Sequence, residues 1–255
     1  FLGSSFAFIG ALTLILKEEG IASVKGGVIA AGFVYVLMSG LVRYFGVEKI
    51  KSFFPPIVVG PIIMVIGLRL SPVALSMSGY KDGNFDPNSL IVALVVIITM
   101  ITVSILEKSF FRLVPILIAV FLGYLTAMSL GMVGFSSFEQ ASWFGFSDLA
   151  KKDLLTIPVF TMTAILGIAP IALVVFIEHI GDIATNGAVV GKDFFKNPGI
   201  TRTLFGDGLA TIVAGFLGGP AVTTYGENTG VLAVTKVYDP AILRIAAVYA
   251  ILLGV

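Results

Sequence analysis

Long apolar stretches follow one another along this chain, and each is long enough to cross a lipid bilayer as a helix. A spanning helix needs about 20 mainly apolar residues, because the hydrocarbon layer is about 30 Å thick. Shorter polar segments separate the stretches, as loops separate the helices of a multi-pass membrane protein. The stretches run roughly from 21 to 44, 54 to 77, 90 to 106, 113 to 133, 155 to 177 and 204 to 218, and another begins at 241.

The composition agrees with this pattern. Of the 255 residues, 57% are hydrophobic and 12% are charged, about half the charged share of an average soluble domain. The formal net charge of +1 gives no basic field that would attract nucleic acid. The absence of cysteine and the single histidine exclude disulfides, iron–sulfur clusters and multi-histidine metal sites. We therefore expect an all-α polytopic membrane protein with no metal and no cofactor.

The ends of the chain also carry information. The first residue is Phe1 rather than Met, and the last residues, 251 to 255, lie inside another apolar run. We expect the chain to be an internal piece of a longer protein.

Two short segments, 1–16 and 222–237, differ from the spanning pattern. Each opens with glycine and polar residues in an extended-looking piece and then becomes apolar and helical. Matching short, glycine-interrupted segments in two halves of an apolar chain are the best sequence indication of a transporter's binding site at the bilayer midplane. The alternative is a pair of interfacial re-entrant turns that bind no ligand.

Lysine and arginine are unevenly divided between the two predicted sides of the membrane, and the richer side is cytoplasmic by the positive-inside rule. The richer side holds Arg43, Lys49, Lys51, Lys108, Arg112, Lys192, Lys196, Arg202, Lys236 and Arg244, and the other side holds Lys17, Lys25, Arg69, Lys81, Lys151 and Lys152.

Glu178 and Asp182 are the first candidates for chemistry. Glu178 follows an apolar helical run, and Asp182 lies one helical turn later on the same face. Burial and mutual repulsion would raise the proton affinity of both carboxylates, which a proton-carrying group requires. The alternative is that the helix has already left the membrane at Glu178 and both groups are solvated.

Glu227 is a further candidate, because it follows Gly226 where a short helix is predicted to begin. The positive end of a helix dipole would favour a polar ligand there. Glu227 could instead cap its own helix. His179 points about 100° away from Glu178 and is predicted to be a structural hydrogen-bonding group. The run 206–208 matches part of a dinucleotide fingerprint, but no strand precedes it, so we reject that interpretation.

These residues resemble the nucleobase/ascorbate transporter family. In its signature an acid or amide precedes Asn-x-Gly, and a Thr followed by a basic residue closes the motif; here Glu227 precedes Asn228-Thr229-Gly230, and Thr235-Lys236 follow. The similarity spans essentially the whole chain. Segments similar to the uracil permease branch are Leu2-Gly3-Ser4-Ser5-Phe6-Ala7-Phe8, Phe54-Pro55-Pro56, Glu178-His179-Ile180-Gly181 and Thr223-Thr224-Tyr225-Gly226-Glu227-Asn228.

The resemblance implies a transporter fold of fourteen spans in two inverted repeats of seven, with two short extended segments at the midplane. This chain would cover about the third to the eleventh span. Residues 1–52 and 153–255 would belong to a core domain that carries the substrate. Residues 53–152 would belong to a gate domain, through which two copies would form a homodimer.

The resemblance also implies a substrate site. Glu178 and Glu227 would hydrogen-bond the edge of a pyrimidine, the backbone at Phe6 and Gly226 would complete the set, and Tyr225 would pack nearby. Proton coupling would involve Glu178 and Asp182. The best-known bacterial uracil carrier has a histidine where this chain has Asp182, and the ordinary pKa values of the two residue types, about 3.9 and 6.5, differ widely.

The function implied is uracil:proton symport across the bacterial cytoplasmic membrane, without enzymatic chemistry. The implied partners are uracil, protons, the lipid bilayer and a second copy of the chain. The nearest alternative is a xanthine or urate carrier of the same family. An anion exchanger of this architecture is less favoured, because two glutamates would repel anions. A membrane enzyme lacks a visible nucleophile with its base.

Overall fold

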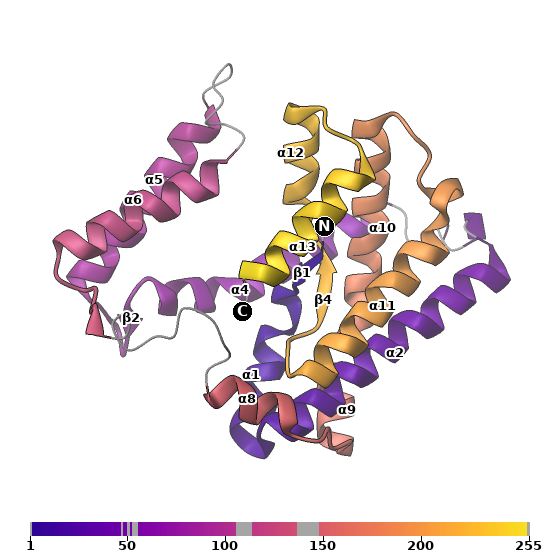
Figure 1. The fold of residues 1–255 in the computed structure, drawn as a ribbon, viewed down its shortest axis with the longest axis horizontal. Helices are drawn as coiled ribbons and strands as arrows, with labels where there is room; N and C mark the ends of the chain where they lie inside the picture. The colour runs from indigo at the N-terminus through magenta and orange to yellow at the C-terminus, as the bar shows by residue number, and fades with distance from the viewer. Residues whose placement is uncertain are drawn as a thin grey trace. The chain divides into compact units, whose positions relative to one another are not determined.

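The computed structural model describes residues 2–46, 48–49, 52, 56–105, 114–136 and 148–253. They are mostly helical, as expected for an all-α polytopic membrane protein (Figure 1). Two compact units are present, one formed by residues 1–66 and 145–255 and the other by residues 67–144. Within the described ranges, the helices long and apolar enough to cross a membrane are Ile21–Phe45, Pro87–Ile105, Met162–Val190 and Phe195–Leu217.

The larger unit holds most of the secondary structure. Its elements are β1 (Leu2–Ser4), η1 (Phe6–Phe8), α1 (Ile9–Glu19), α2 (Ile21–Phe45), α8 (Asp148–Leu155), α9 (Met162–Ile168), α10 (Ile171–Val190), η3 (Phe195–Gly199), α11 (Ile200–Leu217), β4 (Val222–Thr224), α12 (Glu227–Thr235) and α13 (Pro240–Leu253). The helix α4 (Pro56–Met77) passes from this unit into the smaller one.

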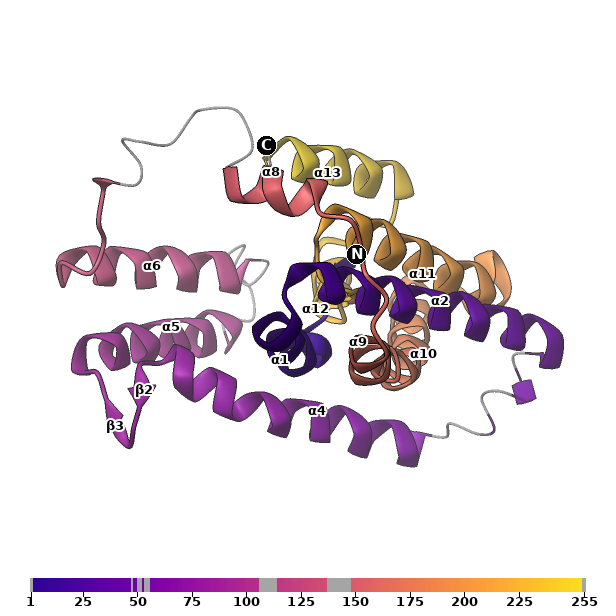
Figure 2. The same cartoon turned by 90° about the horizontal axis from the view of Figure 1, so that it is seen from below.

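Helices α2 and α11 pack against each other along much of their length and run side by side in both views (Figures 1 and 2). Glycines allow this close approach, since a methyl group on Gly32 would lie 2.9 Å from the Gly208 carbonyl oxygen. A methyl group on Gly208 would lie 3.0 Å from the Gly32 carbonyl oxygen. Small residues are typical of helix contacts in membranes, where van der Waals packing drives association.

The predicted span from 155 to 177 is wrong in its boundaries. Helix α8 ends at Leu155, the chain is then non-helical to Thr161, and α9 begins at Met162. The Thr161 side chain caps α9 by accepting a hydrogen bond from the Ala164 amide. Helix α10 continues to Val190, where Gly191 ends it in the left-handed conformation. Glu178 and Asp182 therefore lie inside a helix that continues well beyond them.

Lys25 holds the non-helical segment against α2. Its side chain is 1% exposed, and Nζ donates hydrogen bonds to the carbonyl oxygens of Asp153 at 2.8 Å and Thr156 at 2.6 Å. The Val159 amide also donates to the Ala22 carbonyl at 2.9 Å. A buried ammonium group is tolerated here because carbonyl oxygens replace its water.

The smaller unit contains the end of α4, the hairpin β2 (Tyr80–Lys81) and β3 (Asn84–Phe85), α5 (Pro87–Ile105) and α6 (Pro115–Ser129), with α5 packed against α6. Asp86 caps the start of α5, because its carboxylate accepts hydrogen bonds from the Ser89 amide at 2.9 Å and the Ser89 hydroxyl at 2.6 Å. These bonds hold the pKa of the Asp86 carboxyl below its ordinary value.

Candidate functional site

Strands β1 and β4 pair antiparallel, although the sequence separates them by more than two hundred residues (Figure 1). Leu2 lies opposite Thr224, Gly3 opposite Thr223 and Ser4 opposite Val222. The Ser5 amide extends the ladder by donating to the Ala221 carbonyl at 2.9 Å. Each strand leads into a helical segment, η1 and α1 after β1 and α12 after β4. The two extended segments predicted from the sequence therefore meet.

The pairing brings Tyr225 over β1. Its hydroxyl donates a hydrogen bond of 2.6 Å to the Ser4 carbonyl, and its ring is stacked with Phe6 at 6.3 Å between centroids and 15° between planes. Gly3 leaves room for the ring, since a methyl group there would lie 2.5 Å from Tyr225 Cζ. Phe6 is 55% exposed. Two of the predicted site residues, Phe6 and Tyr225, are thus in contact.

Helix α10 packs against η1, β4 and α12, the segments that carry the other predicted residues. A methyl group on Gly226 would lie 3.0 Å from Asp182 Oδ1, so the carboxylate faces the turn between β4 and α12. Glu178 lies one turn earlier on the same continuous helix and is half-buried. Glu227 is the first residue of α12, and its side chain lies outside what the structure describes.

A buried polar network lies beside Glu178. His179 and Asp207 pair at 2.9 Å between Nδ1 and Oδ2, and Asp207 Oδ2 also accepts a hydrogen bond of 3.2 Å from the Thr224 hydroxyl. His179 Nε2 lies 2.9 Å from the Thr203 hydroxyl oxygen. The side chains of His179 and Asp207 are 1% and 9% exposed. The network joins α10, α11 and β4 next to the predicted site, since His179 adjoins Glu178 and Thr224 adjoins Tyr225 in the chain.

Both ring nitrogens of His179 have polar partners within this network. The Thr203 hydroxyl, which lies beside Nε2, also donates a hydrogen bond of 3.0 Å to the Ile200 carbonyl. His179 is a hydrogen-bonding residue of the helix interface, as its place on the helix predicts.

The sequence interpretation missed Asp207 and Thr224. It considered Asp207 only as part of a dinucleotide fingerprint, and the residue lies in the middle of α11. An ionisable residue within a predicted spanning helix is itself a signal, because burying it in lipid is costly without a partner. A second link was also missed, since the buried Thr229 hydroxyl on α12 donates to Asn186 Oδ1 on α10 at 2.8 Å.

We find no group of three or more histidine, cysteine or acidic residues that could hold a metal ion in the part of the chain that the structure describes. What the site offers instead is a pair of aromatic rings, a half-buried carboxylate pair on α10 and the exposed main chain at Gly226. Such groups can stack on and hydrogen-bond a small planar molecule.

Comparisons with known proteins cover the whole chain. A model described as the permease family matches residues 1–255. The "Probable uracil permease" of Haemophilus influenzae is 42% identical over 252 residues, which cover 98% of this chain and 59% of that protein. The "Uracil permease" of Bacillus subtilis is 39% identical over 259 residues, covering 100% of this chain and 60% of the relative. That of Escherichia coli K12 is 38% identical over 257 residues, covering 100% and 58%. This chain thus spans about three fifths of the length of these relatives.

Proposed function

This chain belongs to the permease family, as its resemblance to nucleobase/ascorbate transporters predicts, and from that premise we propose that the protein containing it takes up uracil across the bacterial cytoplasmic membrane. The names of three relatives, at 38% to 42% identity over nearly all of this chain, support uracil as the substrate. The chain is a multi-pass membrane protein. We assign the protein transport and no chemical catalysis.

The observation that carries the proposal is the pairing of β1 with β4 beside α10. Non-helical backbone at membrane depth is tolerated only inside protein or beside a water-filled cavity. Here it places Phe6 against Tyr225 and Gly226 against Asp182. A planar substrate between such segments could meet both aromatic faces and main-chain hydrogen-bonding groups.

The proposed roles follow the chemistry of uracil, a flat ring with alternating N–H and carbonyl groups. Glu178 and Glu227 accept hydrogen bonds from the ring N–H groups. The main chain at Phe6 and Gly226 meets the carbonyl edge, and the Tyr225 ring packs against one face. The half-buried position of Glu178 supports its role, because a carboxylate shielded from water binds an N–H donor more strongly.

Proton coupling is the second part of the proposal. Glu178 and Asp182 lie one turn apart on α10, so each carboxylate favours a proton on the other. Binding of one proton would remove one of the two negative charges and let the loaded core domain move. One proton entering down 100 mV supplies about 2.3 kcal/mol, and one pH unit adds about 1.4 kcal/mol. Together they sustain an accumulation of several hundredfold.

For the domain division we propose residues 1–52 and 153–255 as core and 53–152 as gate. The separation of the described residues into two compact units, with one formed by both ends of the chain, supports this division. Gate domains of two copies would then form the homodimer. Strands β1 and β4 run antiparallel and each leads into a helical segment, which supports an inverted repeat across the core.

The test is uptake of radiolabelled uracil by cells that lack their own uracil transporter and express the full-length parent protein. We expect saturable uptake that increases at acidic external pH and collapses with a protonophore. Tenfold excess xanthine should leave it unchanged. Competition by xanthine would reassign the substrate to a purine, and uptake that follows a sodium gradient would reassign the coupling ion.

A further inference from the structure

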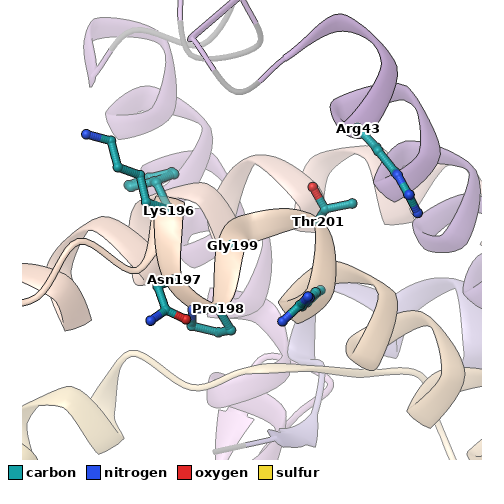
Figure 3. Close-up of a pocket in the computed structure, with 8 residues that line it drawn as sticks. Arg43, Lys196, Asn197, Pro198, Gly199 and Thr201 are labelled. Carbon is teal, nitrogen blue, oxygen red and sulfur yellow. The ribbon is translucent and has the colours of Figure 1, made fainter.

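A hollow of about 580 Å³ lies between the end of α2 and the segment that leads into α11 (Figure 3). None of the described residues that line it belongs to the strand pair. Its size is within the range of small-ligand sites. Arg43 extends into it from the last turn of α2, and the opposite wall is the segment that leads into α11. The residues around it are Arg43, Phe195, Lys196, Asn197, Pro198, Gly199, Thr201 and Arg202.

The charge of this hollow is positive. Lys196 has an exposed acidic neighbour, Asp193, at 3.6 Å. In contrast, neither Arg43 nor Arg202 forms an ion pair or a side-chain hydrogen bond with any residue in the described ranges. The partial charges at the end of α2 and the start of α11 have opposite signs and offset each other. Two arginines without an acidic partner among the described residues therefore determine the local potential.

The walls of the hollow are held in place. The Ser39 hydroxyl on α2 donates a hydrogen bond of 2.8 Å to the Thr201 carbonyl on α11, and Ser39 is buried. One turn of α2 separates Ser39 from Arg43, so this bond holds the end of α2 that carries Arg43 against the start of α11, which carries Arg202. The N-cap of α11 is Gly199, which has no side chain that could fill the hollow at this point. Planar guanidinium forks in fixed positions suit the oxygen atoms of a phosphate group.

The level of the hollow relative to the membrane surface indicates which phosphate-bearing molecule could reach it. Tyr44 and Phe45 directly follow Arg43 and are 83% and 47% exposed. Exposed aromatic residues at the end of a spanning helix mark the level of lipid headgroups. Arg43, Lys196 and Arg202 also lie on the side that the excess of basic residues predicts to be cytoplasmic. Basic pockets between helices on that side bind anionic headgroups.

We propose that Arg43 and Arg202 bind the phosphate group of an anionic lipid of the cytoplasmic leaflet. The site is separate from the uracil site and does not depend on the proposed function. The bound headgroup joins the end of α2 to the start of α11, two helices that pack against each other.

The test uses the purified full-length parent protein in detergent, titrated with dioleoylphosphatidylglycerol or dioleoylphosphatidylcholine and followed by native mass spectrometry. The wild type should bind phosphatidylglycerol more tightly, because choline offsets the phosphate charge. Arg43→Gln and Arg202→Gln should each weaken that binding about fivefold, and the double variant about thirtyfold. Arg244→Gln, on the exposed surface of α13, is the matched control and should bind as the wild type does.

Three results would overturn the site: wild-type affinity in the double variant, equal affinity of the wild type for both lipids, or an equal loss in Arg244→Gln. If the double variant elutes as an aggregate, wild-type affinity for phosphatidylglycerol in both single variants would overturn the site instead. A second part of the test adds inorganic phosphate as a competitor. If millimolar phosphate displaces phosphatidylglycerol from the wild type but not from Arg43→Gln, the lipid assignment is overturned and the ligand is a free phosphate ion.

Discussion

Gly3→Ala gives a direct test of how the strand pair builds the site. The added methyl carbon would lie 2.5 Å from Tyr225 Cζ and 2.7 Å from Cε2, so the ring must move. Gly3 lies within a strand and has no positive φ, so alanine does not strain the backbone. The substitution therefore acts through the Tyr225 ring alone.

The size of the effect follows from the contacts that the ring loses. Moving it breaks the 2.6 Å hydrogen bond to the Ser4 carbonyl and the stack with Phe6. Stacking of a base on an aromatic side chain contributes about 1–3 kcal/mol. We expect uracil to bind about tenfold to hundredfold more weakly. Forcing an extra methyl group into this contact should also cost about 1–3 kcal/mol of stability.

The assay is equilibrium binding of labelled uracil to the purified full-length parent protein, with thermal unfolding measured on the same samples. Gly10→Ala is the matched control, because Gly10 lies within α1 and a methyl group there meets nothing within 4 Å. It should bind uracil as the wild type does and be at least as stable. Wild-type uracil affinity in Gly3→Ala would refute the placement of Tyr225 in the site.

The remaining predictions concern the buried polar groups. Asp207→Ala removes the carboxylate that His179 and the Thr224 hydroxyl share, and it should cost about 3–5 kcal/mol of stability. Asp207→Asn should cost less, because the side-chain amide can still hydrogen-bond to both groups. Equal melting temperatures for the two variants would contradict this network. Lys25→Met removes the buried donor to the carbonyls of Asp153 and Thr156 and should cost about 2–4 kcal/mol, while the exposed Lys17→Met should change little. Both pairs are compared by size-exclusion chromatography after heating, and equal losses in Lys25→Met and Lys17→Met would count against the bonds to the backbone.

Spanning helices with clear ends could be predicted from the sequence to within a few residues. The stretch predicted at 21–44 is α2, Ile21–Phe45, and that at 90–106 is α5, Pro87–Ile105. Glycine with positive φ precedes and follows α2, at Gly20 and Gly46. Apolarity and these breakers are both properties of the local sequence, so no distant contact is needed to find them.

The stretch from 155 to 177 shows where hydropathy fails. Its first residues are as apolar as a helix would be, but Val159 hydrogen-bonds to Ala22 of α2 instead. That partner lies far away in the sequence, and an apolar residue has the same hydropathy in either conformation. The apolar stretch predicted to end at Ile177 also stops too early, because the charges of Glu178 and Asp182 lower the hydropathy while α10 continues to Val190.

The candidate site, like the helices, could be predicted from the sequence only in part. The two short segments could be identified from their glycine and polar residues, but only the structure gives the register that opposes Gly3 to Thr223. The partners of His179 were not visible either, because Asp207 and Thr224 come from different elements. The roles of Phe6, Glu178, Tyr225, Gly226 and Glu227 in binding, and of Asp182 in proton coupling, remain proposals.

Uracil binding to the Glu178→Gln variant of the full-length parent protein tests the central claim most directly. The claim is that α10 presents an acid to a substrate held beside the strand pair. Equilibrium binding of labelled uracil should be saturable in the wild type, unchanged in the control Glu18→Gln on the exposed end of α1, and undetectable in Glu178→Gln with an unchanged elution profile. Wild-type affinity in Glu178→Gln would contradict the account.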